Sequence, residues 1–447
     1  MSCKQPMKLP WAAISAISLS TLLTVACGRA ESSPVGSDPF KGQPVRARKA
    51  SPVIEALEKR VERVPSDFVA HNKLAQEYLQ QMRETGDVAF LELALLTANR
   101  SLAIAPAEQN IEGLAVLAQA EYSSHNFTAS RQHAEQLLRL DPGKGYTFQL
   151  LGDSLLELGE YEKARDAFGK MVEFGGIQPM TKVAMHQRLA RLSMLNGDNR
   201  RGEQHLETAL SIAGSMLEPP RETIAWCRWQ LGETAFAWGK YEKAEEYYRQ
   251  SLAGFPGYYR SVASLGRVLA AKGDLEGSIR EYEKVTAVMP DPKYIAALGD
   301  VYAAAGRTDD AARQFEIADR IGKLSNAKTG LYNRELALFY ADHGIDRETA
   351  YQMAANEYSR RRDIYGADAL AWTALKAGKI EEARSAIREA MKLGTQDPRI
   401  YYHAGMIAAA AGEGAEAKSM LTRALSISPA FDPMQAATAR LTLRELN

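Results

Sequence analysis

The chain has 447 residues, of which 46% are hydrophobic and 25% are charged, so its composition is that of a folded protein rather than a disordered one. Lysine and arginine together number 55, as do aspartate and glutamate, which leaves no formal net charge. This balance argues against a nucleic-acid-binding protein, because such affinity depends on an excess of cations. Three cysteines are too few for a disulfide framework.

The N-terminal segment is predicted to direct export. Lys4 and Lys8 precede an apolar run, Trp11–Ala26, which is short for a membrane span but suits the hydrophobic region of a secretory signal. The run ends in LLTVACG, which resembles a bacterial lipoprotein signal. The resemblance implies that Cys27 becomes the lipidated first residue of a protein anchored in the cell envelope. The alternative is ordinary cleavage near Ala30, which gives a soluble secreted or periplasmic protein.

The segment after the apolar run is rich in glycine, proline, serine and charge. It has too little apolar surface to bury, so it is predicted to be a flexible tether.

The remainder of the chain repeats a helical pattern, with no strand-like alternation of any length. GEYEKARDAF at 159–168 recurs as GKYEKAEEYY at 239–248, and other glycines occupy the same place at a basic spacing near 34 residues. Such a glycine ends one helix in the left-handed conformation and turns the chain into the next. In one unit His125 replaces the glycine, and there Asn126 is expected to be left-handed. The landmark glycines are Gly86, Gly159, Gly197, Gly239, Gly273, Gly306, Gly344, Gly378 and Gly412.

Two further columns accompany the landmark. A small residue stands seven positions before the landmark glycine of a unit, and another stands five positions after it. A large residue follows four positions after the second small residue. Small side chains let the two helices of a unit approach closely, and the large residue is expected to fill the gap that they leave. Examples of the first small column and the large column are Gly152 with Phe168, Gly232 with Tyr248 and Gly299 with Phe315.

Together these columns resemble the tetratricopeptide repeat family over about Phe68 to Pro429, and the best unit is Trp229–Pro256. The resemblance implies an all-α fold, an α-solenoid that coils as a right-handed superhelix of about ten helix-turn-helix units. We assign 1–27 to the signal peptide, 28–52 to the tether, 53–430 to the repeat array and 431–447 to a C-terminal capping helix.

The resemblance also implies that the first helices of the units line a concave groove. Aromatic residues and arginines on the outward-facing positions of these helices are the residue types that dominate binding at protein interfaces. Two of them have an alternative role, since Trp226 and Tyr402 also suit packing between units. The predicted groove residues are Tyr146, Asp153, Trp226, Trp229, Glu233, Phe236, Arg260, Arg267, Lys293, Trp372 and Tyr402, with Gln149, Asp300 and Arg334 at similar positions.

One basic run has a simpler interpretation. Arg360–Arg362 falls at the end of a predicted second helix, where cations favour the negative end of the helix dipole. We expect this run to be a solvated terminus rather than a docking site.

The sequence contains no recognisable catalytic motif. No histidine pair has the spacing of a zinc protease, and the chain has neither a phosphate-binding loop nor a nucleophile elbow. We therefore predict no enzyme activity, no metal and no cofactor. The predicted function is a membrane-tethered scaffold or assembly factor that binds a protein or peptide segment in the groove, without nucleic acid. The alternative is that the same groove binds a glycan or another small ligand.

Overall fold

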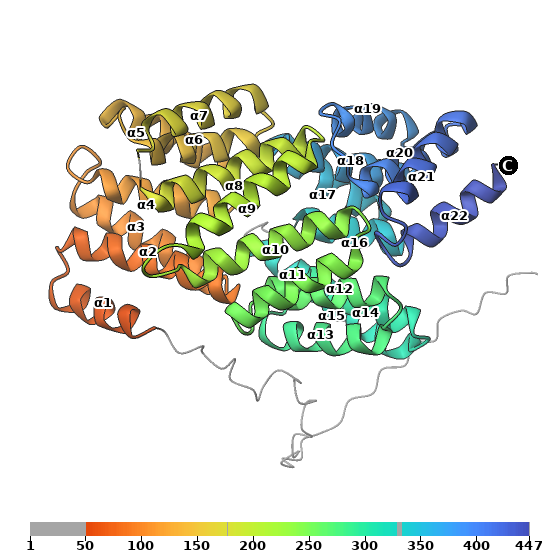
Figure 1. Ribbon diagram of the computed structural model, residues 1–447, viewed down its shortest axis with the longest axis horizontal. Coiled ribbons are helices and arrows are strands. Elements are labelled where there is room, and N and C mark those ends of the chain that lie inside the picture. The colour runs from red at the N-terminus through yellow and green to blue at the C-terminus, as the bar shows by residue number, and fades with distance from the viewer. Residues whose placement is uncertain (1–50, 177, 329–332, 447) are drawn as a thin grey trace, which may run out of the picture. The chain divides into compact units, whose positions relative to one another are not determined.

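The computed structural model describes residues 51–176, 178–328 and 333–446. The signal segment, Cys27 and most of the tether lie outside these residues. All regular secondary structure in the described ranges is helical (Figure 1). The helices are α1 (Pro52–Arg63), α2 (Phe68–Thr85), α3 (Ala89–Ile104), α4 (Ile111–Ser123), α5 (Phe127–Leu140), α6 (Gly145–Glu157), α7 (Tyr161–Phe174), α8 (Pro179–Leu195), α9 (Asn199–Gly214), α10 (Arg221–Ala237), α11 (Tyr241–Gly254), α12 (Tyr259–Ala271), α13 (Leu275–Val288), α14 (Pro292–Ala304), α15 (Thr308–Lys328), α16 (Asn333–His343), α17 (Arg347–Arg360), α18 (Ile364–Lys376), α19 (Ile380–Met391), α20 (Pro398–Ala410), α21 (Gly414–Ile427) and α22 (Gln435–Glu445).

Within the described ranges, α2 to α21 pair into ten antiparallel hairpins, and each hairpin packs against the next. Helix α1 packs on α2 at one end, and α22 covers α20 and α21 at the other. The predicted all-α solenoid is confirmed. It forms because each hairpin has an apolar face that only a neighbouring hairpin can bury.

The small and large columns meet inside the hairpins as expected. A Cβ atom on Gly232 would lie 2.4 Å from the ring of Tyr248, and one on Gly299 would lie 2.4 Å from the ring of Phe315. Gly152 faces Phe168 in the same way, at 2.5 Å. The large residue of the second helix therefore occupies the space that the missing side chain of the first helix leaves.

The landmark glycines all have positive φ, but the unit without a glycine differs from the prediction. His125 is left-handed, with φ at 62°, whereas Asn126 has φ at −86°. The expectation for Asn126 is wrong because its side chain caps α5 by accepting from the backbone N–H of Ala129, and this role requires a negative φ. The left-handed turn therefore falls on the preceding residue.

Hairpins far apart in the sequence also touch. A Cβ atom on Gly159 would lie 2.2 Å from the carbonyl oxygen of Arg362, and one on Gly197 would lie 2.5 Å from that of Gly394. The hydroxyl of Thr395 donates to the carbonyl of Leu195, and Figure 1 shows the end of α8 near α19. The turns of early hairpins thus pack on loops about two hundred residues later, so the array closes on itself.

Candidate functional site

The inner side of the array is formed by the first helices of the hairpins. Successive first helices pack on one another, as α2 does on α4, α4 on α6, and α16 on α18. Successive second helices make no comparable contact in the described residues. The array therefore curves with its first helices inside, and outward positions on these helices face a concave surface.

A cavity of about 740 Å³ lies on this concave surface, across α2, α4 and α6. Each helix presents residues spaced by three and four positions, which places them on one face. Gln76, Leu79, Gln80 and Arg83 of α2 follow this spacing, and the lining residues of α4 and α6 occupy equivalent positions. The apolar lining residues, here called the floor, are Leu79, Ile111, Ala115, Val116 and Leu150, and the polar lining residues are called the rim.

The rim of the cavity is polar. Two predicted groove residues, Tyr146 and Gln149, lie here, and the Tyr146 side chain is 38% exposed. Burial, followed by the negative charges of Asp141 and Glu112, raises the pKa of Tyr146. The remaining polar lining residues are Gln76, Glu77, Gln80, Arg83, Glu112, Gln119 and Asp141. Amide side chains both donate and accept hydrogen bonds, so this rim matches the needs of a peptide main chain.

The predicted aromatic and basic cluster of α10 and α12 exists, but its members mainly contact one another. The Trp226 and Trp229 rings meet edge to face, with centroids 6.3 Å apart. The Arg260 guanidinium lies 5.1 Å from the centroid of the Trp229 ring and 5.1 Å from that of Tyr259. The indole N–H of Trp229 donates to the hydroxyl of Ser264 at 2.9 Å. The cluster is pre-ordered by these internal contacts rather than an open aromatic pocket.

Three more residues that were predicted to lie in the groove contact one another. They are Glu233, Phe236 and Arg267. The Arg267 guanidinium donates to both carboxylate oxygens of Glu233 at 2.7 Å and lies 4.1 Å from the centroid of the Phe236 ring. The phenol of Tyr248 also donates to Glu233. Burial raises the pKa of Glu233, but Arg267 and these hydrogen bonds together hold it below its ordinary value. Glu233 is therefore charged and already paired.

Two predicted groove residues lie in the core instead. Trp372 is 1% exposed and Tyr402 is 2% exposed, so the prediction that they line a groove is wrong. The indole N–H of Trp372 donates to Asp342, and its ring stacks on His403 with centroids 4.2 Å apart. The Tyr402 ring packs against those of Trp372 and Phe431, with centroids 5.4 and 5.7 Å apart, so rings of neighbouring segments cover positions that face outward in an isolated hairpin.

The other predicted groove residues lie partly in the core and partly on the surface. Phe236 is 4% exposed and belongs to the core, as does Asp153 at 7%. Asp153 accepts from the Arg188 guanidinium at 2.7 Å. Lys293 is exposed at the start of α14. The cavity thus retains Tyr146, while most of the other predicted residues stabilise the array.

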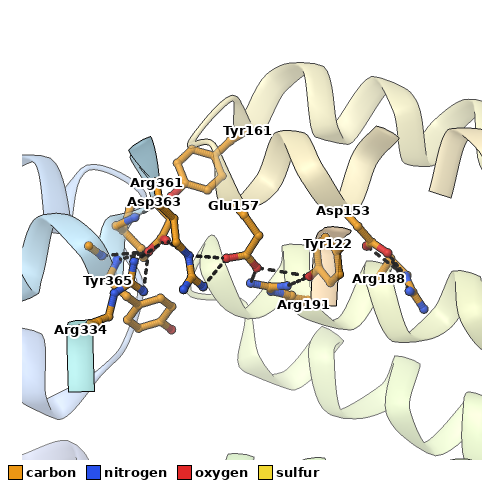
Figure 2. A network of polar contacts seen from close by, with 12 residues as sticks. Tyr122, Asp153, Glu157, Tyr161, Arg188, Arg191, Arg334, Arg361, Asp363 and Tyr365 are labelled. Carbon is orange, nitrogen blue, oxygen red and sulfur yellow. Dashed lines mark hydrogen bonds and ion pairs between the residues drawn. The ribbon is translucent and has the colours of Figure 1, made fainter. Parts of the chain in front are cut away.

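A polar network that sequence reasoning missed joins the two contacting regions of the array (Figure 2). Glu157, at the end of α6, is 3% exposed and accepts hydrogen bonds from Arg191 of α8 and Arg361, which follows α17. Burial raises the pKa of Glu157, but the two arginines hold it well below its ordinary value. Arg361 is therefore a partly buried ion-pair partner, and the expectation that the whole Arg360–Arg362 run is a solvated terminus is wrong.

No group of three or more potential metal-ligating side chains occurs in the described residues. In the same residues, no helix is both long and apolar enough to cross a bilayer. The described chain is thus an α-solenoid of helical hairpins whose concave face carries an open cavity.

Comparison with known families agrees with this class. Tetratricopeptide repeat models match residues 116–175, 182–256, 235–301, 296–316 and 369–430, which together span more than half of the chain. The chain belongs to the tetratricopeptide repeat family. Proteins of this family are generally non-catalytic scaffolds for protein interactions, and the chain has that architecture.

The chain is 28% identical over 291 residues to the TPR repeat-containing protein YpiA of Bacillus subtilis (strain 168), a match that covers 63% of each protein. It is 26% identical over 210 residues to the Protein CTR9 homolog of Arabidopsis thaliana, covering 45% of this chain and 18% of that protein. The crystal structure of the yeast Tom70 is 12% identical, with a TM-score of 0.32, and covers 85% of this chain and 96% of that one. The chain spans less than two thirds of the length of the two sequence relatives, so their activities do not carry over to it.

Proposed function

We propose that this protein is a membrane-tethered scaffold that holds an extended segment of a partner protein in the cavity across α2, α4 and α6. The observation that carries the proposal is the cavity itself, an apolar floor with an amide-rich rim on three equivalent helix faces. Its volume of about 740 Å³ falls within the roughly 300–1,000 Å³ typical of ligand sites. Side chains of the partner would pack against the apolar floor, while the rim amides would form hydrogen bonds with its main chain.

The test compares two variants of the full chain as bait for proteins of the same cell envelope. Tyr146→Ala with Gln149→Ala removes the exposed ring and one rim amide. Glu162→Ala with Arg165→Ala is the matched control, because this exposed pair lies on α7 in the same hairpin, away from the cavity. Loss of an exposed aromatic anchor typically weakens an interface by about 2 kcal/mol, or roughly 30-fold. A partner that the cavity variant loses and the control retains supports the proposal; a partner that both retain equally contradicts it.

A glycan is the second candidate, because Tyr146 presents an exposed ring beside amide side chains, which is an arrangement that also suits a sugar face. Calorimetric titration with cell-wall fragments separates the two. Heat that disappears in the Tyr146→Ala, Gln149→Ala variant favours the glycan, whereas absence of heat from any fragment leaves the protein segment.

The membrane tether is supported by the lipoprotein-like LLTVACG segment and the Gly- and Pro-rich stretch after it. Labelling of cells with an acyl-chain probe tests it through Cys27→Ala. We expect the natural chain to take up the label and to sediment with membranes, and the variant to do neither. Equal labelling of both chains would exclude lipidation at Cys27.

A further inference from the structure

The cavity rim carries an excess of negative charge. Glu77, Glu112 and Asp141 contribute three carboxylates to the lining, whereas Arg83 is the one cation among the described lining residues. None of the three carboxylates forms an ion pair with a described residue. Only Glu112 has a side-chain hydrogen bond, from the amide of Gln76 at 3.3 Å.

The single cation, Arg83, leaves the lining with a net negative charge, because the three carboxylates outnumber it. The Arg83 guanidinium donates to the side-chain carbonyl of Gln80. Burial raises the pKa of Glu222 on α10, and the positive charge of Arg83 opposes part of that rise. The three rim carboxylates therefore lack an ion-pair partner among the described residues, in contrast to Glu157 and Glu233, which are each paired with an arginine.

We propose that the partner segment held in this cavity is cationic, with lysine or arginine side chains placed between aliphatic ones. This inference rests on the proposed function and adds the chemistry of its partner. The aliphatic side chains would occupy the floor formed by Leu79, Val116 and Leu150, and the cationic ones would meet Glu77, Glu112 and Asp141. Such complementary charge steers association and weakens as salt increases.

The probe is a set of short synthetic peptides with leucine at fixed positions and lysine, glutamine or glutamate at all others. Binding of each peptide to the full chain is measured by fluorescence anisotropy at low and at physiological salt. We expect affinity to fall in the order lysine, glutamine, glutamate, and only the lysine peptide to lose affinity as salt increases. Equal binding of the lysine and glutamate peptides would overturn the inference.

Charge neutralisation within the cavity provides the decisive variant. Glu77→Gln, Glu112→Gln and Asp141→Asn together should weaken the lysine peptide about tenfold, since each exposed ion pair contributes a modest amount. The matched control removes three exposed carboxylates from second helices, Asp166→Asn, Glu173→Gln and Glu207→Gln, and changes the net charge equally. A control that weakens the peptide as much as the cavity variant contradicts the inference, because the attraction is then not local.

The two proposals fail separately. If the native partner depends on Tyr146 but binds the charge-neutralised variant normally, the cavity is the binding site and the cationic class is wrong. If binding of the partner depends on neither Tyr146 nor the three carboxylates, the cavity assignment itself is wrong.

Discussion

Glu157 shows how much one side chain contributes to the closed array. Its side chain is 4% exposed, and it is paired with Arg191 of α8 and with Arg361, which follows α17 and lies far from α8 in the sequence. Removing one partner from a buried ion pair costs about 3–5 kcal/mol, because the remaining charge is left unpaired. Here Arg191 is 41% exposed, so water compensates part of that loss.

We therefore expect Glu157→Gln to destabilise the chain by about 2 kcal/mol, below the usual cost of a fully buried pair. Equilibrium unfolding in urea measures the change. Glu162→Gln is the control, since its ion pair with Arg165 is exposed, and it should leave the unfolding free energy nearly unchanged. Equal stability of the two variants would show that the network contributes no net stability.

The same residue predicts a pH dependence. The arginines lower the pKa of Glu157 in the folded state below its unfolded value, so the folded state favours the charged carboxylate. Its contribution is complete above the ordinary glutamate pKa and is lost as the pH falls below that value toward the folded one. The difference in unfolding free energy between the natural chain and Glu157→Gln should therefore shrink between neutral pH and pH about 3. A difference that stays constant over this range contradicts the assignment.

The sequence predicted that Gly232 must be small because the large side chain of Tyr248 packs against it. A Cβ atom there would lie 2.4 Å from the Tyr248 ring, which is 0% exposed and has nowhere to move. Gly232→Ala should thus cost about 1–3 kcal/mol through overpacking. Gly169→Ala is the control, because this helical glycine of α7 has no atom within 4 Å of the added Cβ, and it should stabilise the helix slightly. Circular dichroism during thermal unfolding measures both.

The exposure of a single residue was harder to predict where neighbouring helices pack against the same face of a helix. Tyr146 and Trp372 both occupy outward positions of first helices, but only Tyr146 remains exposed. Helical spacing predicts that two residues share a face; it does not predict which later helix covers that face. Trp372 is covered because side chains of the two neighbouring first helices reach it: its indole N–H donates to Asp342 of α16, and its ring stacks on His403 of α20.

At the scale of elements, the turns of the hairpins have two different environments. Gly159 and Gly306 have the same φ of 77°, so the intrinsic cost of a side chain is equal at both. Only Gly159 faces another part of the chain, the carbonyl of Arg362, while nothing lies within 4 Å of a Cβ on Gly306. The difference between alanine variants at these positions therefore isolates the contact between distant hairpins.

Gly306→Ala should cost about 1–2 kcal/mol, the price of a left-handed alanine. Gly159→Ala should cost about 1–3 kcal/mol more, because the added atom meets a backbone carbonyl that cannot turn away. Urea unfolding of both variants tests the difference. Equal losses would mean that the hairpins do not touch at Gly159 in solution.

Hairpin positions could be predicted because the glycine and small-residue columns act within a unit of local sequence. His125 marks the limit of that reasoning, since the choice between two adjacent residues depended on which one caps α5. The sequence also contains no local sign that Arg361 reaches Glu157, because a contact between residues 204 positions apart depends on the accumulated curvature of several hairpins.

At the scale of the whole molecule, that closure changes how the array should unfold. Repeat arrays are usually quasi-one-dimensional, since each unit contacts only its neighbours, and their ends can unfold independently. Here the amide of Ile364 donates to the phenol of Tyr161, and the amide of Ala430 donates to that of Tyr241, so early and late hairpins share contacts. The first bond ties the opening of α7 to that of α18, and the second ties α11 to the loop after α21.

We expect native-state hydrogen exchange to show α6, α7 and α18 opening with one common free energy in the natural chain. In the double variant Glu157→Gln, Gly159→Ala, the amides of α6 and α7 should exchange at a lower free energy than those of α18. The two groups separate because each side then depends only on its sequence neighbours. Independent opening already in the natural chain would show that the long-range contacts do not couple the hairpins, while joint opening that persists in the variant would assign the coupling to the remaining contact at Tyr161.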